Sequence, residues 1–516
     1  MVKVPPVITA SGLMRRQACY NALETRGILV SESRLAEAKV HVDAEINKNL
    51  AIASKAWEKV LYVGLDNAPR TRLKPLFDAG TIDELSYQLT IDNSFNIRSS
   101  QKFLAFLKDY GYKVPKITKK TNAGEWESKE GTSELALREM IMENQFGGPS
   151  GDEALIAVLN VRELITLRSR YLNARLFPMP EGPVYLSSYN AGSGTLTGRR
   201  SSKKHIYGYG GNGQNFPKHN DTAERFRRCL VARPEYILLS VDQISAEDWP
   251  VNALANDLAG LTELRSGADR HTKLAAFIFA LDINSKTPEQ WKESIERYLG
   301  KKTRHASNYD MKAPRMHDAL MQEGKFFPVE VCESLLKRAH AANPNIKQVF
   351  HNYIQDSINR SKTLITPYGR ERQFLEFRPG SKNGNLWNEA YAYIPQSVVG
   401  DNTGFAVEEL VLSPEQNIYL LQEGHDSIVQ EVKYRDSSEC GTISNNASDI
   451  DRLVVALERT VEAFDREIEF YNGIKINIPV EAELSFDFAR SVKVKTLDRA
   501  GIEAALAKLG PRSSDI

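Results

Sequence analysis

The sequence has few cysteines, and their spacing argues against two common ways of stabilising a chain. The 516 residues include 4 cysteines: Cys19, Cys229, Cys332 and Cys440. They form neither a CxxC pair nor a cluster with histidine, so neither a structural zinc site nor a disulfide framework is expected. The pattern favours a protein that works in a reducing compartment.

Long hydrophobic runs are also missing. No apolar stretch reaches the ~18 residues that cross a bilayer, and the N-terminal residues lack the apolar core of a signal peptide. We therefore predict no membrane partner and an intracellular, soluble protein located in the cytoplasm.

An excess of charge of one sign is absent as well. The 67 Lys and Arg residues nearly cancel the 66 Asp and Glu residues and leave a net charge of +1. The net charge therefore does not select a polyanionic partner, although basic residues outnumber acidic ones between Thr197 and Arg233. The length exceeds what a single hydrophobic core holds, so about three structural units are expected.

Hydrophobic spacing in the first third of the chain predicts helices joined by polar segments. Apolar residues three and four positions apart indicate helices up to about residue 62. The polar, Lys-rich residues 113–131 predict a loop. A helix is expected to restart directly after it, with Thr132 or Ser133 as its cap.

The middle and end of the chain predict strands as well as helices. Residues 179–258 are rich in Gly, Ser and Thr and predict short strands, then a buried strand at 236–242 and a helix at 246–260 with Pro250 in its first turn. Helices dominate 259–383, and residues 417–434 predict two strands around a tight turn. The expected fold class is helix-rich α+β, a discontinuous domain with a helical insertion.

Two aspartates stand where the buried strands end or turn. Asp242 closes the run YILLSVD, and Asp426 lies in the turn of QEGHDSIV. Each alone is typical of a helix cap or a turn residue. If the two strands are neighbours, the carboxylates meet at one sheet edge and repel unless a cation lies between them. Mg²⁺ suits such oxygen ligands, and two ions ~3.5–4 Å apart would activate an attacking oxygen and stabilise a leaving one.

Lys301, His305 and Tyr309 form a second pattern. Their spacing of four on one predicted helix places them on one face. Two cationic or protonatable groups and an aromatic ring suit a triphosphate with a base stacked behind it. A basic solvent-exposed helix face is the alternative.

Several stretches resemble, in the same order along the chain, the motifs of family A DNA polymerases, the DNA polymerase I-like group. LTGRRSS and NGQNFP resemble segments that contact the primer–template, VDQISAEDWPVNALAND resembles motif A, and DRHTKLAAFIFAL resembles the segment that opens the fingers. KKTRHASNY resembles motif B, ITPYGRER a G-R-x-R stretch, AYIPQSVVGD the segment with a template-contacting glutamine, and EGHDSIVQEV motif C. The resemblance covers nearly the whole chain.

The resemblance assigns roles to individual residues. Asp242 and Asp426 become the catalytic, metal-binding aspartates, together with the backbone of Gln243. Glu247 becomes a wall against the 2′ position of the sugar, and Asp248 remains as a candidate helix cap. The nucleotide-binding residues that it implies are Glu247, His271, Lys301, Arg304, His305 and Tyr309, and the DNA-binding residues are Arg199, Gln214, Asn215, Arg370, Gln396 and His425.

The resemblance also implies an architecture and an activity. The fold would be a right-hand polymerase, with an N-terminal helical region at 1–62, a thumb at 63–178, a palm at 179–258 and 384–516 with an antiparallel sheet, and helical fingers at 259–383. The activity would be templated addition of deoxynucleotides to a primer 3′ end. Two Mg²⁺ ions are the implied cofactors, with Mn²⁺ as the alternative, and primer–template DNA and dNTPs are the implied partners.

The sequence departs from the family at several positions. His305 replaces a lysine thought to protonate pyrophosphate, Lys301 stands where arginine is usual, and Ser427 replaces the glutamate of H-D-E. Asp310 follows Tyr309 where glycine is common. Extra residues make KKHIYGYGG an added loop, for which a plain flexible turn is favoured over a phosphate cradle. These departures resemble phage or viral relatives, which implies genome replication in the host cytoplasm.

The thumb-like region begins near the start of the sequence, so no 3′–5′ exonuclease domain is expected before it. We therefore expect that this chain polymerises without proofreading, or proofreads through another chain, or is a fragment of a longer protein. A separate exonuclease, helicase or primase is a candidate partner.

Three other functions stay open. A single-subunit RNA polymerase shares the palm, but Glu247 would crowd the 2′-hydroxyl that such an enzyme must accept. A non-catalytic DNA-binding protein with a polymerase fold would not need both Asp242 and Asp426. A metal-dependent nuclease that uses the same two carboxylates is the third.

Overall fold

The computed structural model describes residues 8–63, 68–120, 126–144, 152–191, 195–218, 220–378, 386–434, 447–510 and 512. They form two compact units. The first, the sheet unit, comprises Met1–Ala36, Tyr171–Lys312 and Glu333–Ile516, and the second, the helical unit, comprises Glu37–Arg170 and Ala313–Cys332.

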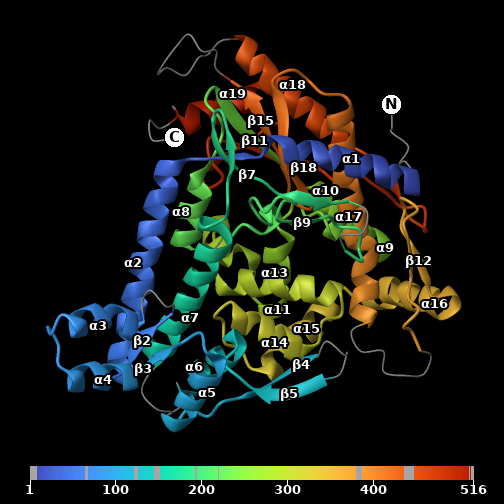
Figure 1. Ribbon diagram of the computed structural model, residues 1–516. Helices are drawn as coiled ribbons and strands as arrows, with labels where there is room; N and C mark the ends of the chain where they lie inside the picture. The colour runs from blue at the N-terminus through green and yellow to red at the C-terminus, as the bar shows by residue number, and fades with distance from the viewer. Residues whose placement is uncertain are drawn as a thin grey trace. The chain divides into compact units, whose positions relative to one another are not determined.

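A five-stranded antiparallel sheet is the centre of the sheet unit (Figure 1). Its strand order is β14-β15-β11-β18-β19. The strands are β11 (Tyr236–Gln243), β14 (Ile418–Glu423), β15 (Ser427–Lys433), β18 (Val480–Ser485) and β19 (Ser491–Val494). The predicted strand at 236–242 and the predicted hairpin at 417–434 are therefore confirmed, and they are neighbours in one sheet.

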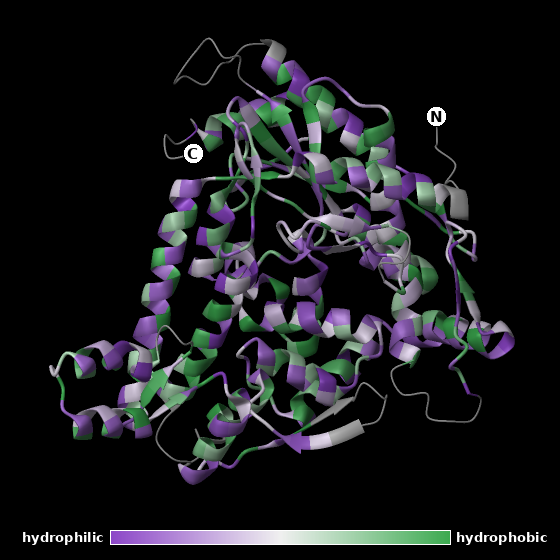
Figure 2. Cartoon of the chain, viewed as in Figure 1, coloured by the Kyte–Doolittle hydropathy of each residue, from purple (hydrophilic) through white to green (hydrophobic). Residues whose placement is uncertain are grey.

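Alternation along β11 divides the sheet into an apolar and a polar face. Ile237, Leu239 and Val241 are fully buried, whereas the other face carries the buried Leu238 and then the half-buried Ser240 and Asp242 toward the end of the strand. One hydrophobic cluster joins the apolar side chains to helices α1 (Ala10–Arg26), α17 (Leu386–Leu412), α18 (Ala447–Phe464) and α19 (Arg499–Leu509). Figure 2 shows predominantly hydrophobic residues along these strands. The polar face is left for chemistry.

A second antiparallel sheet, in the order β10-β1-β7-β6, corrects the prediction that residues up to about 62 are helical. Its strands are β1 (Ile28–Val30), β6 (Phe177–Met179), β7 (Gly182–Tyr185) and β10 (Leu230–Val231). The apolar run of β1 is paired on both sides, which outweighs the helical spacing around it. Gly27, at φ 62°, makes the turn into β1, and a Cβ there would lie 2.6 Å from Leu186.

The helix expected at 246–260 is in fact two helices, α9 (Asp248–Leu254) and α10 (Leu258–Arg265). Asn256 has a positive φ of 52°, which ends α9. The side chain of Asp257 then caps α10 by accepting from the backbone N–H of Gly260. Pro250 lies in the first turn of α9, as predicted.

The other elements of the sheet unit are mostly helical. They are β8 (Ser188–Asn190), β9 (Ser201–Lys203), η2 (Gly213–Asn215), α8 (Asp221–Cys229), α11 (Arg270–Phe279), η3 (Ile283–Ser285), α12 (Pro288–Glu293), α13 (Ile295–Asn308), η4 (Ile346–His351), α16 (Asn352–Ser361), β12 (Thr363–Ile365), β13 (Glu371–Gln373), β16 (Ile468–Glu469) and β17 (Lys475–Ile476).

The helical unit packs around aromatic side chains, with Trp57 in contact with Phe103, Phe106, Tyr110 and Tyr112. Its elements include α3 (Pro69–Asp78), α4 (Glu84–Asp92), α5 (Ser100–Asp109), α6 (Glu134–Asn144), α7 (Asp152–Leu167), α14 (Ala313–Gln322) and the parallel strands β2 (Val60–Tyr62) and β3 (Ser94–Asn96). The helices α2 (Glu32–Trp57) and α15 (Val329–Ala342) and the π-helix η1 (Arg168–Leu172) each span a boundary between the units.

The predicted loop at 113–131 contains a hairpin. β4 (Lys116–Lys120) and β5 (Trp126–Glu130) pair antiparallel, and the turn between them lies outside the described residues. Backbone pairing of a polar segment, which leaves no apolar periodicity, explains why the sequence indicated a loop. Ser133 rather than Thr132 caps α6, because its hydroxyl accepts from the N–H of Ala136 at 3.4 Å.

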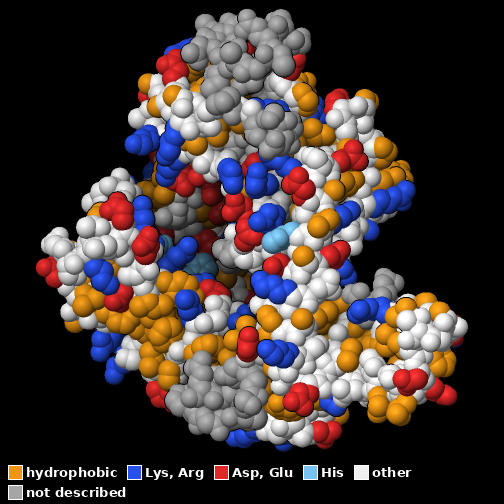
Figure 3. Space-filling view, turned by 90° about the vertical axis from the view of Figure 1, so that its left-hand side faces the viewer, with side chains coloured by type: hydrophobic (Ala, Val, Ile, Leu, Met, Phe, Trp, Pro, Cys, Tyr) orange, Lys and Arg blue, Asp and Glu red, His pale blue; other side chains and the backbone are white. Residues whose placement is uncertain are grey.

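The structure confirms the predicted fold class, a helix-rich α+β chain with an antiparallel sheet. None of the helices in the described ranges is long and apolar enough to cross a membrane. On the face that Figure 3 shows, Lys and Arg side chains are intermixed with Asp and Glu, in line with the small net charge.

Candidate active site

Asp242 and Asp426 lie beside each other because their strands are neighbours. β11 and β15 run antiparallel, and Asp242 pairs in register with Ser427. The backbone N–H of Gln243 donates to the carbonyl of Asp426 at 3.1 Å. The prediction that the two aspartates meet at one sheet edge is confirmed.

Burial and mutual repulsion make this pair unfavourable in its ionised form. The pKa of Asp242 is raised to about 7, mainly by burial and then by the negative charges of Asp426 and Glu481. Burial also raises the pKa of Asp426. The Oδ1 atom of Asp242 is buried and has no hydrogen-bond partner in the part of the chain that the structure describes. A cation between the carboxylates would satisfy this oxygen and offset the repulsion.

The residues present fit a magnesium site that relies on its substrate for ligands. Among the described residues no cluster of three or more His, Cys, Asp or Glu side chains could hold a metal. Two carboxylates are what Mg²⁺ uses where water and substrate phosphates complete its octahedron. The backbone of Gln243 stays a predicted ligand, and its side chain amide is occupied by Thr403 Oγ1 at 2.9 Å.

The sequence did not single out two charged residues at this edge, Lys218 and Glu481. Glu481 pairs in register with Asp242 from the other side of β11, and Lys218 attracts both aspartates. Lys218 directly follows NGQNFP, and Glu481 is one of the acids that alternate with apolar residues in VEAEL. Alternation was the available signal for Glu481, but its neighbour strand was not predictable.

Glu247 is held from two sides. It forms an ion pair with Arg199 and accepts a hydrogen bond from the hydroxyl of Tyr309. Burial and the nearby carboxylate of Glu247 raise the pKa of Tyr309 well above its usual value, so its hydroxyl stays a donor. The carbonyl of Tyr309 is fixed in turn by the side chain of Asn388 at 2.6 Å. Glu247 is therefore held in one position beside Asp426, on the turn between β11 and α9, and its role as a wall against the sugar stays a prediction.

The helix α13 presents one exposed and one buried face. The prediction that Lys301, His305 and Tyr309 share one face of a helix holds for the first two, which are exposed, whereas Tyr309 lies just beyond the helix end and is buried. Arg304 lies on the buried side, where its Nε atom donates to Asp248 at 3.0 Å. Tyr309 directly follows the last helical residue and lies 5.6 Å from the ring of His305, centroid to centroid.

Asp248 is not the helix cap that the sequence suggested. Its carboxylate accepts from Arg304 and, at 3.2 Å, from Asn308, and it lies 3.8 Å from Arg270. These cations hold the pKa of Asp248 below its usual value despite burial. Asp248 therefore joins α9 to α11 and α13. Leaving the buried Arg270 and Arg304 without an anion would cost more free energy than leaving the start of the helix without a side-chain cap.

His271 lies beside this group in neutral form. Burial, together with the charge of Arg304, lowers its pKa to about 4, and its Nδ1 atom is buried without a hydrogen-bond partner. Its predicted nucleotide contact is untested, but an unpartnered ring nitrogen is a free position for one.

Two of the predicted DNA-binding residues, Gln214 and His425, meet at the turn between β14 and β15. His425 adopts a positive φ of 74°, and its Nδ1 atom is hydrogen-bonded to Gln214 at 3.4 Å. Burial, with Arg199 and Arg200 nearby, lowers the pKa of His425 to about 4. The carbonyl of Asn215 accepts from Tyr171, and Gln396 is half-buried on α17. Gln214 therefore lies at the turn between β14 and β15 that holds Asp426, which we call the aspartate turn.

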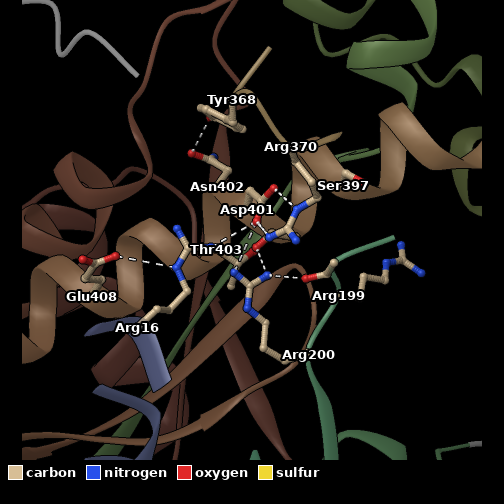
Figure 4. Close-up of polar contacts among 12 residues, drawn as sticks. Arg16, Arg199, Arg200, Tyr368, Arg370, Ser397, Asp401, Asn402, Thr403 and Glu408 are labelled. Atoms are coloured by element: carbon tan, nitrogen blue, oxygen red, sulfur yellow. Dashed lines mark hydrogen bonds and ion pairs between the residues drawn. The ribbon is translucent and has the colours of Figure 1, made fainter. Parts of the chain in front are cut away.

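Arg370 has a partner inside the protein that the sequence did not predict. Its Nε and Nη2 atoms donate to the two carboxylate oxygens of Asp401, at 2.8 and 2.7 Å. Asp401 is fully buried and also accepts from Arg16 at 3.0 Å, while Arg200 lies 3.7 Å away (Figure 4). The guanidinium of Arg370 is therefore held by Asp401, and its predicted DNA contact stays a prediction.

Asp310, the unexplained acid of the sequence, pairs with lysines. Its carboxylate lies 2.5 Å from Lys312 and 3.5 Å from Lys347, and these contacts hold its pKa below the usual value despite burial. Its backbone takes a positive φ of 52° just after α13, which is why glycine also suits this position.

Comparison with known proteins agrees with this arrangement. The family described as DNA polymerase family A matches residues 78–463, which is more than half of the chain and includes both aspartates. The chain therefore belongs to DNA polymerase family A.

Individual relatives are distant and cover part of their length. The chain is 24% identical over 283 residues to the thermostable DNA polymerase I of Thermus aquaticus and 27% identical over 281 residues to that of Thermus filiformis. Each match takes in 53% of this chain and 31% of the relative, so the chain spans less than a third of their length.

A solved structure shares the fold. It is the POL domain of Pol1 from M. smegmatis in complex with DNA primer-template and dNTP, with a TM-score of 0.64 at 18% identity. The similarity covers 92% of this chain and 70% of that chain.

Replacing Asp401 with Asn should destabilise the protein strongly. Arg16, Arg200 and Arg370 would lose their shared anion, and leaving buried charges unpaired costs about 3–5 kcal/mol of the free energy of unfolding. Urea unfolding followed by circular dichroism measures the loss. Asp451→Asn removes an exposed ion pair to Arg499 and is the control, with an expected cost of at most about 1 kcal/mol. Equal effects of the two substitutions would contradict the role given to Asp401.

The raised pKa of Asp242 predicts how stability depends on pH. A carboxyl whose pKa is higher in the folded state holds its proton more tightly there, so its contribution is present at low pH and lost as pH rises from about 4 to 7. Without metal, Asp242→Asn should therefore be more stable than the wild type above pH 7, on the order of 2–4 kcal/mol, and the difference should shrink toward pH 4. Thermal unfolding across this range, with and without Mg²⁺, measures it.

Mg²⁺ provides the control for this measurement. It should raise the melting temperature of the wild type at pH 7.5 and have little effect on Asp242→Asn. If the difference in stability between the wild type and Asp242→Asn does not vary with pH, the raised pKa of Asp242 described above is contradicted.

Proposed function

We propose that the chain is a DNA-templated DNA polymerase that adds deoxynucleotides to a primer 3′ end. Membership of DNA polymerase family A supports this, and the observation that carries it is the pair Asp242 and Asp426 on adjacent strands. A structural role does not explain well why two buried carboxylates lie side by side with both pKa values raised. In a polymerase family, such a pair would bind the metal ions.

In this proposal Asp242 and Asp426 hold two Mg²⁺ ions, with Mn²⁺ as an alternative. When bound, such ions lower the pKa of the attacking hydroxyl and stabilise charge on the leaving oxygen. The protein's own contribution is to fix the two carboxylates on β11 and β15, so that no rearrangement is needed when charge develops. Lys218 adds a positive charge at the same edge.

The incoming nucleotide is assigned to the exposed face of α13 and to the wall that Glu247 forms. Lys301 and His305 are free to face a triphosphate, and Arg304 supports that face through Asp248. Glu247 has its two oxygens fixed by Arg199 and Tyr309, so it would not swing aside for a 2′-hydroxyl. The ring of His271 and the ring of Tyr309, which would pack against the incoming nucleotide, are the other proposed nucleotide contacts.

Primer–template DNA is assigned to the residues around the aspartate turn. His425 and Gln214 are in contact there, and Asn215 directly follows Gln214 in the sequence. Arg199 lies close enough to His425 and Asp426 for its positive charge to act on both. Gln396, which is half-buried on α17, is the proposed template contact. Arg370 is also proposed to contact DNA, through the part of its guanidinium that is exposed while Asp401 binds it.

The biological setting is proposed from the departures in the sequence. Ser427 in place of the family's acid, Lys301 and His305 on the fingers helix and the added loop at 203–210 support a phage or viral replication enzyme. A separate exonuclease, helicase or primase remains a proposed partner.

Asp242→Ala should abolish primer extension while primer–template binding is retained. The substitution removes a metal ligand but no proposed DNA contact, so the rate of nucleotide addition should fall at least ~10³-fold. A labelled primer extended with Mg²⁺ and dNTPs gives the rate, and fluorescence anisotropy gives the affinity. Asp451→Ala, on the exposed side of α18, is the matched control and should extend normally. Unchanged extension by Asp242→Ala would refute the assignment.

Glu247→Ala should relax the choice of sugar. Removing the wall lets a 2′-hydroxyl enter, so the preference for dNTP over rNTP, as the ratio of kcat/KM values, should drop ~10²-fold or more. The wild type should prefer dNTPs, and this separates the proposal from a single-subunit RNA polymerase. If the wild type extends a primer as well with ribonucleotides, the RNA polymerase is the better account.

A further inference from the structure

The added loop at residues 203–210 presents two apolar side chains to solvent. Ile206 is 86% exposed and Tyr207 is 73% exposed, next to the exposed lysines Lys203 and Lys204. Adjacent large apolar residues at a loop tip lose free energy in water and are typical of contact surfaces. The nucleotide-addition chemistry gives them no role.

The tip of the loop is a turn closed by backbone hydrogen bonds. The N–H groups of His205 and Gly208 donate to the carbonyls of Tyr209 and His205, at 3.0 and 2.8 Å. Gly210 donates to the carbonyl of Arg175 at 2.7 Å, and its positive φ of 59° brings it so close to Leu186 that a side chain would overlap the backbone. The tip is therefore presented in a defined conformation.

The base of the loop is packed on its inner side. The ring of Tyr209 lies 5.1 Å from Phe177 and 4.3 Å from the guanidinium of Arg175. Glu24 lies beside the loop, 3.8 Å from His205, and also accepts from Ser188 at 2.7 Å and from the backbone of Tyr189 at 2.9 Å. These hydrogen bonds leave its negative charge in place, but the two exposed lysines Lys203 and Lys204 outweigh this single acid, so the net charge of these groups is positive and favours an anionic partner.

Both ends of the loop are tied to the proposed active site. Ser202, just before it, donates to Asn212 at 2.6 Å and accepts from the N–H of Gln214 at 3.2 Å. Gln214 reaches His425 in the aspartate turn. If the primer end of a nucleic acid lies at the turn that holds Asp426, the duplex behind the primer end would lie within reach of the 203–210 loop.

We propose that the 203–210 loop binds the duplex part of the primer–template, with Lys203 and Lys204 on the phosphates and Ile206 and Tyr207 against the minor groove. The inference rests on the proposed function. Minor-groove contacts of other proteins combine basic residues with apolar wedges of this kind. Lysines on a phosphate backbone contribute independently of sequence, which a polymerase requires.

The double variant Ile206→Ala/Tyr207→Ala tests the apolar contact. Its Kd for a primer–template with 20 base pairs should rise about 5- to 20-fold, with the rate of single-nucleotide addition at saturating DNA unchanged. Leu258→Ala/Leu412→Ala removes two other exposed apolar side chains of the sheet unit and should leave the Kd unchanged. An unaltered Kd in the loop variant overturns the proposal.

The double variant Lys203→Ala/Lys204→Ala tests the phosphate contacts. The slope of log Kd against log salt concentration should decrease by about 1–2, because each phosphate contact releases about one counterion. An unchanged slope contradicts the lysine contacts. Single-stranded DNA of the same length tests whether the loop binds duplex. If Ile206→Ala/Tyr207→Ala loses as much affinity for single strands as for duplex, the assignment to duplex is wrong.

The two proposals fail in distinguishable ways. If the wild type extends primers and the loop variants bind duplex normally, the loop inference alone is wrong. If the wild type binds duplex through the loop but extends no primer with either nucleotide set, the proposed function is wrong and the assignment to the primer–template fails with it.

Discussion

The repulsion between Asp242 and Asp426 is the constraint on which the other features of the site depend. The five-stranded sheet forces the two carboxylates together, since β11 and β15 must pair to bury the core against α18 and α19. Burial then raises both pKa values, and one oxygen of Asp242 has no hydrogen-bond partner among the described residues. The fold thus keeps an unfavourable charge arrangement that a divalent cation would relieve.

Asp401 shows how the same chain treats a carboxylate that has a structural role. This aspartate is fully buried, yet Arg16 and Arg370 donate to it directly and Arg200 lies close by (Figure 4). These contacts join the helix α1 to α17. The contrast with Asp242 is the physical reason for assigning metal to one acid and packing to the other.

Sequence reasoning predicted what depends on local pattern and missed what depends on pairing. The strand ending at Asp242, the hairpin at Asp426 and the exposed face of Lys301 and His305 follow from periodicity and turn residues. The positions of β1 and Glu481 do not, because each is defined by a partner strand far away in sequence. The Asp401 cluster had one weak signal, an acid within an apolar helix, but the identity of its arginines required the fold.

The central claim is that Asp242 and Asp426 together bind a divalent cation, and metal-directed cleavage of the backbone tests it most directly. With Fe²⁺ in place of Mg²⁺ and ascorbate with peroxide, radicals formed at the ion cut the chain nearby. The account predicts cuts beside both Asp242 and Asp426, suppressed by excess Mg²⁺ and lost in Asp242→Asn. Cuts at other positions only, or cuts that Mg²⁺ does not suppress, would contradict it.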